Sequence, residues 1–166
     1  IIMIAVVCNC SGYKLKEEGT ISGGTGRWTS PNTGATNEFG FNGVAESKRD
    51  EAGNFANEET LGAYFWTASS YNTTTAYTFN LGYNHGNLYD YATIGYANKK
   101  NGLSVRCIVD SNTHVGPFVD SVNGDVYDTI KIGTQVWLAS NLRATKYRNG
   151  TTIPLVTTNA AWAALT

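Results

Sequence analysis

Closely spaced turn signals constrain this chain more than any other feature of its sequence. Between residues 12 and 110, reverse turns are marked by Gly23-Gly24, Ser30-Pro31-Asn32, Asn42-Gly43 and Asn101-Gly102. The runs between them are short and rich in aromatic and β-branched residues, and no window has strong helical periodicity. The pattern predicts short antiparallel strands joined by short loops.

Four runs are the predicted strands of this region: 63–68, 76–81, 86–91 and 103–109. In the second run aromatic and polar residues alternate, which predicts Tyr77 and Phe79 on one face and the polar side chains on the other. The last run also alternates, and it predicts one face made of Leu103, Val105 and Cys107. A single helical turn is expected within residues 58–64.

A linker is predicted over residues 111–117, and a new start follows it. Residues 126–132 alternate and are separated by Gly133-Thr134 from residues 135–138, which predicts a β-hairpin. Its first strand is expected to present on one face Val126, Asp128, Ile130 and Ile132. Asn159 is expected to cap a helix over residues 159–165. Because this helix stops too early to bury its apolar face, the chain is expected to end within a domain.

Near-neutral charge argues against one class of partner. The 166 residues carry a net charge of −1, and only 15% of them are charged. Nucleic-acid binding depends on basic groups that displace counterions from phosphates, so no nucleic-acid partner is expected.

Residues 1–7 are almost wholly apolar but too few to span a bilayer. They fit either the end of a signal peptide or a buried strand, and no membrane span is expected.

Three cysteines leave the redox state open. Cys8 and Cys10 flank one residue, and Cys107 lies far along the chain. A disulfide from one of them to Cys107 and free buried thiols both fit this spacing. A zinc site would need a second pair of cysteines or histidines to complete it. No such pair is found, so no metal and no other cofactor is expected.

Several motifs occur in an order that resembles a known family. In the first part of the chain they are 12–19 (GYKLKEEG), 28–37 (WTSPNTGATN), 40–41 (GF), 66–69 (WTAS) and 102–107 (GLSVRC). This part resembles the C-terminal half of the Fibrobacter succinogenes major paralogous domain. The second part resembles the start of the same domain, through 126–127 (VY), 130–142 (IKIGTQVWLASNL) and 147–154 (YRNGTTIP).

The resemblance implies a division of the chain into four segments. They are an unmatched apolar segment over 1–11, the C-terminal part of one copy over 12–110, a linker over 111–119, and the N-terminal part of a second copy over 120–166. The implied fold is α+β and mostly β, C-type-lectin-like, with twisted antiparallel sheets and long loops. The family's middle portion is missing from both parts. The fold is therefore expected to be incomplete, or else the two parts pair with each other as in a circular permutant.

Members of this family are typically exported, as lipoproteins or as multi-repeat surface proteins of Bacteroidetes-like bacteria. The resemblance thus implies a secreted or cell-surface location, with neighbouring repeats of the same chain as partners. No activity is firmly attached to the family. Its superfamily includes the formylglycine-generating oxygenases, which need a reactive cysteine pair. The three cysteines are wrongly placed for such a pair, so no enzyme activity is expected.

Residues 71–98 have the composition of a binding surface. Tyrosine gives broad contact at low entropic cost and asparagine gives adaptable hydrogen bonds, as in antibody loops. A glycan or a protein would suit such a surface. The predicted ligand-binding residues are Tyr71, Tyr77, Asn80, Tyr83, Asn84, His85, Asn87, Tyr89, Asp90, Tyr91 and Tyr96. The alternative is that half of the tyrosines pack on the sheet and the asparagines make turns.

Other conspicuous polar residues are interpreted as structural. The oxygen ligands of a calcium loop are loosely matched by Asp120, Asn123, Asp125 and Asp128. The closing Glu of an EF-hand is absent, so Asn123-Gly124 is interpreted as a hairpin turn. Arg106 is expected to pair with a buried carboxylate or carbonyl group.

The tryptophans Trp28, Trp66 and Trp137 are expected in the core, because a large aromatic in an alternating strand usually packs inward. His85 has no marked nucleophile beside it, so a loop position without catalytic role is expected.

Two function hypotheses follow. The first is a noncatalytic extracellular binding module that contacts a glycan or protein through the Tyr/Asn-rich face. The second is a structural spacer repeat of a surface array with no ligand of its own. Exposure separates them, because a binder should present these side chains as one outward patch and a spacer should bury or scatter them.

Overall fold

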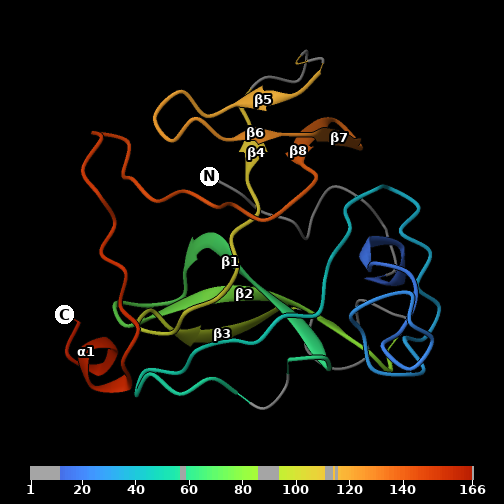
Figure 1. Cartoon of the computed structure of the whole chain (residues 1–166), viewed down its shortest axis with the longest axis horizontal. Helices are drawn as coiled ribbons and strands as arrows, with labels where there is room; N and C mark the ends of the chain where they lie inside the picture. The colour runs from blue at the N-terminus through green and yellow to red at the C-terminus, as the bar shows by residue number, and fades with distance from the viewer. Residues whose placement is uncertain (1–11, 57–58, 86–93, 111–113, 115, 166) are drawn as a thin grey trace.

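The computed structural model describes residues 12–56, 59–85, 94–110, 114 and 116–165. The fold is mostly β with a little helix, as predicted, and its strand pairings are antiparallel. In chain order the elements are η1 (Gly12–Leu15), β1 (Gly62–Ser70), β2 (Thr75–Gly82), β3 (Ile94–Asn98), β4 (Ile108–Val109), β5 (Phe118–Val119), β6 (Val126–Tyr127), β7 (Thr129–Ile132), β8 (Gln135–Leu138) and α1 (Asn159–Ala163). Figure 1 shows the β1–β2–β3 sheet below the smaller strands β4–β8.

The largest sheet has the order β1-β2-β3. Phe65 of β1 pairs with Phe79 of β2, and both are buried, so they lie on the inner face. Tyr64 pairs with Asn80 one residue further along, and these side chains lie on the opposite, outer face. The predicted strands 63–68 and 76–81 and the predicted alternation are confirmed. The predicted strand 86–91 lies outside the described residues.

Two hairpins form in the second part of the chain, as predicted. The turn at Gly133 (φ 61°) joins β7 to β8, and the turn at Gly124 (φ 84°) joins β5 to β6. Both glycines have the left-handed backbone that is unfavourable for other residues. The expected continuous strand 126–132 is divided between β6 and β7 at Asp128, and these two strands belong to different sheets.

The core joins both parts of the chain. On the inner face of the large sheet, Phe41 meets Phe65 edge-on at 5.6 Å and Trp137 at 6.2 Å, measured between ring centroids. Trp28 and Trp137 are buried, as predicted. Burial of such a side chain is worth about 1.5–3 kcal/mol. Since β4 from residues 12–110 also pairs with β8 from residues 120–166, the two parts pack as one body.

The predicted strand 103–109 is longer than the observed one, and Arg106 lies in the interior. Only β4, at 108–109, is a strand there, because Arg106 turns inward and is 1% exposed. Its guanidinium donates to the carbonyl oxygens of Phe41 and of Leu138, and to Asn141 Oδ1 at 2.8 Å and 3.0 Å. The expected carbonyl pairing is confirmed. The expected face of Leu103, Val105 and Cys107 is wrong, since Val105 and Cys107 pack against the core while Leu103 lines an outer cleft.

Three smaller expectations are also corrected. Residues 59–61 form a turn within the predicted range 58–64, but Gly62 already begins the strand, so the turn is shorter than predicted. Helix α1 is capped by Thr158, whose side chain accepts from the backbone N–H of Ala161, rather than by Asn159. Trp66 is half-buried on the outer face, because it shares the alternation of Tyr64, and it lines a hollow of ≈ 200 Å³.

Candidate functional site

Three of the predicted tyrosines form an exposed cluster at one end of the large sheet. Tyr77 and Tyr96 are paired residues of β2 and β3, and Tyr71 follows β1. The rings of Tyr71 and Tyr96 stack at 4.8 Å with an interplanar angle of 8°, and Tyr77 meets Tyr71 edge-on at 5.5 Å. Tyr71 and Tyr96 are 53% and 63% exposed. The cluster therefore presents broad aromatic surface to the outside.

The turn that carries Tyr71 is held in place by its neighbours. Asn72 Oδ1 accepts hydrogen bonds from the backbone N–H groups of Thr74 and Thr75, at 2.9 Å and 2.8 Å. Lys99 Nζ, just after β3, donates to the carbonyl oxygens of Asn72 and Thr73. These contacts fix the turn against β3, so the stacked rings are pre-ordered.

The remaining predicted site residues divide into separate groups. Tyr83 is half-buried and packs against the core, and exposed Asn84 follows it, both past the C-terminal end of β2. His85 is half-buried, and its carbonyl oxygen accepts from Lys16 Nζ at 3.2 Å. From Tyr77 to Tyr83 the chain advances about 20 Å at the rise of a strand. These residues and the tyrosine cluster are therefore not one patch. Asn87, Tyr89, Asp90 and Tyr91 lie outside the described residues.

A cleft of ≈ 530 Å³ opens on the outer face of the same sheet. Its floor is made by Tyr64, Thr78 and Asn80, which the strand register places side by side. One wall is the loop 48–52, and the other is formed by residues of 96–103. In Figure 1 the loop passes the side of the large sheet that faces away from β7 and β8. Tyr96 lines the cleft as well as stacking on Tyr71, so the cleft and the tyrosine cluster adjoin.

The cleft carries more negative than positive charge. Asp50 accepts from the side chain of Asn54 at 3.1 Å and from its backbone N–H at 2.8 Å, and these bonds hold the pKa of Asp50 below its usual range. Glu51 accepts from Asn98 Nδ2 at 2.5 Å. Lys48 brings one cation, whose Nζ lies 4.4 Å from the centroid of the Tyr64 ring. Two carboxylates thus oppose one ammonium group.

Two asparagines that line the cleft have an unused acceptor. The side-chain oxygens of Asn80 and Asn101 are shielded from solvent and have no hydrogen-bond partner among the residues that the structure describes. A buried acceptor without a donor costs about 1–3 kcal/mol. A donor group that enters the cleft would recover this free energy.

Sequence reasoning found part of the cleft and missed the rest. Asn80 and Tyr96 were predicted, while Tyr64, Asn101 and the loop 48–52 were not. Their segments are far apart in the sequence and meet through tertiary contacts, among them the paired backbones of Arg49 and Gly102 and the bond from Asn98 to Glu51. One local signal for Tyr64 was present in the sequence. The alternation of residues 63–68 places Tyr64 on the face opposite to Ala63 and Phe65, which face inward.

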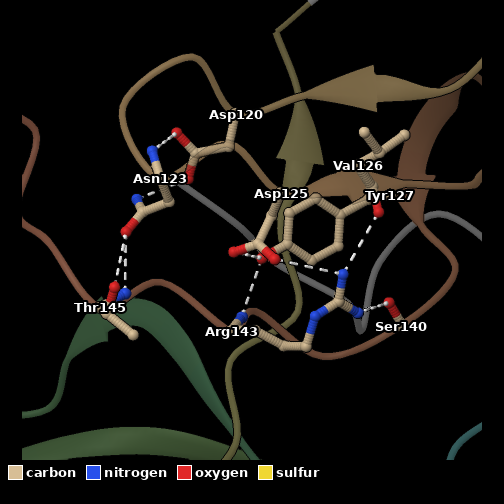
Figure 2. Close-up of polar contacts among 8 residues, drawn as sticks. All are labelled: Asp120, Asn123, Asp125, Val126, Tyr127, Ser140, Arg143 and Thr145. Atoms are coloured by element: carbon tan, nitrogen blue, oxygen red, sulfur yellow. Dashed lines mark hydrogen bonds and ion pairs between the residues drawn. The ribbon is translucent and has the colours of Figure 1, made fainter.

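The acidic loop at residues 120–128 is built from hydrogen bonds (Figure 2). Asp120 accepts from the side chain of Asn123 at 2.8 Å and from the backbone N–H groups of Val122 and Asn123. The Asn123 side-chain oxygen accepts from the backbone N–H groups of Thr145 and Lys146, each at 2.8 Å. These oxygens therefore tie the β5–β6 turn to the segment around residue 145, and the hairpin interpretation of Asn123-Gly124 is confirmed.

Arg143 joins the same region to Tyr127, as Figure 2 shows. Its guanidinium lies 4.5 Å from the Tyr127 ring centroid and donates to the carbonyl oxygen of Val126 at 3.2 Å. Its Nη2 is 3.6 Å from Asp125 Oδ1. Tyr127 Oη accepts from the backbone N–H of Arg143 at 2.9 Å. Asp125 is thus engaged by neighbouring side chains.

The described part of the chain was predicted to contain no metal site, and its cysteine is Cys107. Among those residues no group of three or more His, Cys, Asp or Glu could hold a metal ion. Cys107 is a free thiol, and burial raises its pKa, which favours the protonated form. Cys8 and Cys10 lie outside the described residues. Among the described residues, no helix has the length and apolar character of a membrane span.

Comparison with known proteins identifies no relative: no family model, no curated protein and no solved structure matches the chain. The resemblance to the paralogous domain therefore stays a prediction.

Proposed function

We propose that this chain is a noncatalytic binding module of a secreted or cell-surface bacterial protein, and that the β1–β2–β3 sheet holds its glycan or protein ligand. The proposal includes the resemblance to the paralogous domain and its C-type-lectin-like fold. The single observation that carries it is the pair of stacked, exposed tyrosines, Tyr71 and Tyr96, at the rim of the cleft.

Exposed aromatic surface of this kind is informative because it is unfavourable in water. Single exposed apolar side chains are common on proteins, but a pre-ordered cluster beside a cleft is typical of a recognition surface. Tyrosine also binds at low entropic cost, since it has only two side-chain torsions. The turn 71–75, fixed by Asn72 and Lys99, lowers this cost further.

A spacer repeat is the second candidate. It is favoured by the inward packing of Tyr83 and by the distance of Asn84 from the tyrosine cluster, which scatter part of the predicted set. The two functions differ in whether the exposed tyrosines bind anything.

The test is binding of the native chain to a glycan array and to an array of surface proteins. The double variant Tyr71→Ala/Tyr96→Ala is compared with Tyr147→Ala, which removes a tyrosine of equal exposure, 53%, outside the sheet. We expect binding to weaken about tenfold or more in the double variant, as for an aromatic hot spot, and to persist in Tyr147→Ala. Equal binding by all three would move the site away from these tyrosines. Absence of binding on both arrays would favour the spacer.

A further inference from the structure

The walls of the cleft are fastened together before any ligand arrives. Arg49 and Gly102 exchange backbone hydrogen bonds at 2.9 Å and 2.8 Å, which joins the loop 48–52 to the segment that leaves β3. The 2.5 Å bond from Asn98 to Glu51 closes one rim. A volume of ≈ 530 Å³ is within the range of small-molecule sites. Because the cleft is pre-formed, little binding free energy is lost in ordering it.

The polar groups of the cleft favour a ligand that donates hydrogen bonds. The unpartnered oxygens of Asn80 and Asn101 are acceptors, and Asp50 and Glu51 add carboxylate oxygens. The last torsion of an asparagine side chain is soft, so both carboxamides can turn toward a donor. Hydroxyl groups are donors that also accept from Lys48 and from asparagine Nδ2 groups.

The charge and the apolar lining of the cleft further restrict the class of ligand that it can bind. Two carboxylates against one ammonium group disfavour an anionic ligand, because like charges repel in a partly enclosed site. Tyr64, Ala97 and Leu103 give apolar surface between the polar groups. A sugar ring has both properties, with hydroxyl donors at its edge and C–H groups on its faces.

We infer that the cleft is a subsite for one neutral sugar unit of a glycan, with Asn80 and Asn101 accepting hydrogen bonds from its hydroxyl groups. This inference rests on the proposed binding function and adds its ligand class. The stacked tyrosines, which adjoin the cleft through Tyr96, then contact a neighbouring unit of the glycan.

The test is a titration of the ¹⁵N-labelled chain, followed by amide chemical shifts, with neutral methyl hexosides (gluco, galacto and manno) and with methyl glucuronide as the matched anionic probe. We expect saturable shifts at Thr78, Asn80 and Asn101 with at least one neutral hexoside, and binding of the glucuronide weaker by about fivefold or more. Asn80→Leu removes one acceptor and should weaken the hexoside about fivefold, as for loss of a single hydrogen bond. Asn149→Leu, which changes an exposed asparagine in the 147–151 turn outside the sheet, is the matched control and should bind as the native chain.

Each other outcome overturns the inference at a distinct point. Hexoside shifts confined to Tyr71 and Tyr96 would place the sugar at the rim and leave the binding module standing. Equal or tighter binding of the glucuronide would refute the charge argument. No shift with any glycoside, while the native chain still captures proteins on the array, would remove the sugar and keep a protein ligand. No shift and no array binding would remove the proposed function as well.

Discussion

Replacement of Lys16 by methionine tests how this fold tolerates a buried ammonium group. The side chain of Lys16 is 0% exposed, and its Nζ donates to the carbonyl oxygens of Thr33, Gly82 and His85 at 3.0–3.2 Å. The Nζ also lies 5.4 Å from the centroid of the Trp28 ring. Removal from water disfavours the charged form and lowers the pKa of Lys16 from 10.5 to about 8.

The lowered pKa makes stability depend on pH in a calculable way. Between pH 8 and pH 10.5 the unfolded chain binds the proton of Lys16 more strongly than the folded chain does. Stability from this group therefore rises with pH through that window. With pKa values of 10.5 unfolded and about 8 folded, the gain between pH 8 and pH 10 is about 2 kcal/mol. Below pH 8 the curve is nearly flat, because both states hold the proton.

The assay is urea unfolding of the native chain and Lys16→Met at pH 7, 8, 9 and 10, followed by tryptophan fluorescence. The pKa values of Cys107 and Tyr127 are raised in the folded chain, so the contribution of these two groups to stability falls at high pH. Both groups are present in the native chain and in the variant, so their contributions cancel in the difference. We expect the difference in unfolding free energy, native minus variant, to rise by about 2 kcal/mol from pH 8 to pH 10. A difference that stays constant within about 0.5 kcal/mol would refute the burial argument.

Lys14→Met is the matched control for this experiment. Lys14 bonds Glu38 at 2.8 Å on the surface, and that hydrogen bond raises its pKa above 10.5. Its titration thus lies above the window, and its difference curve should show no rise between pH 8 and pH 10.

Two further substitutions test the other buried cations. Arg106→Leu leaves the carbonyl oxygens of Phe41 and Leu138 without their donor, and should lower the free energy of unfolding in urea by about 3 kcal/mol or more; a loss below about 1 kcal/mol would contradict the role assigned to it. Arg49→Ala removes the donor to Val156 and the cation over the Trp162 ring at 4.4 Å. Amide hydrogen exchange in 153–165 should then speed up about tenfold or more while β1 and β2 keep their protection. Exchange in 153–165 that is as slow in the variant as in the native chain would contradict this anchoring.

The sequence predicted the elements whose signals are local. Alternation over a few residues predicted β1 and β2, with Phe79 and Asn80 on opposite faces, and turn glycines predicted both hairpins of the second part. The run 103–109 has the same alternation, yet Arg106 takes the interior position. Its many donors satisfy the carbonyl groups of irregular segments there. The pattern of polar and apolar residues alone does not predict the free energy gained from these hydrogen bonds.

The candidate site was predictable in composition but not in shape. Tyr71, Tyr77 and Tyr96 each stood in the predicted set, but they stack because the register pairs Tyr77 with Tyr96 and the turn brings Tyr71 back over them. Tyr83 has the same residue type and packs against the core instead. The cleft needs the loop 48–52 to cross the sheet, which depends on contacts between distant segments.

The buried cations explain how long irregular segments can hold a pre-formed cleft beside the sheet. The described residues of 16–61, which exclude 57 and 58, contain no named strand or helix, so their carbonyl groups need donors other than a ladder. Lys16, Arg49 and Arg106 supply these donors from the interior, and each joins segments far apart in sequence. The Arg49 side chain donates to the Gly53 carbonyl oxygen at 2.9 Å, within the loop beside the cleft. The Arg49 backbone pairs with that of Gly102, which lies in the segment that forms the other wall. The same residue thus fastens the C-terminal segment and shapes the cleft wall, so loosening of residues 153–165 in Arg49→Ala should be accompanied by weaker ligand binding.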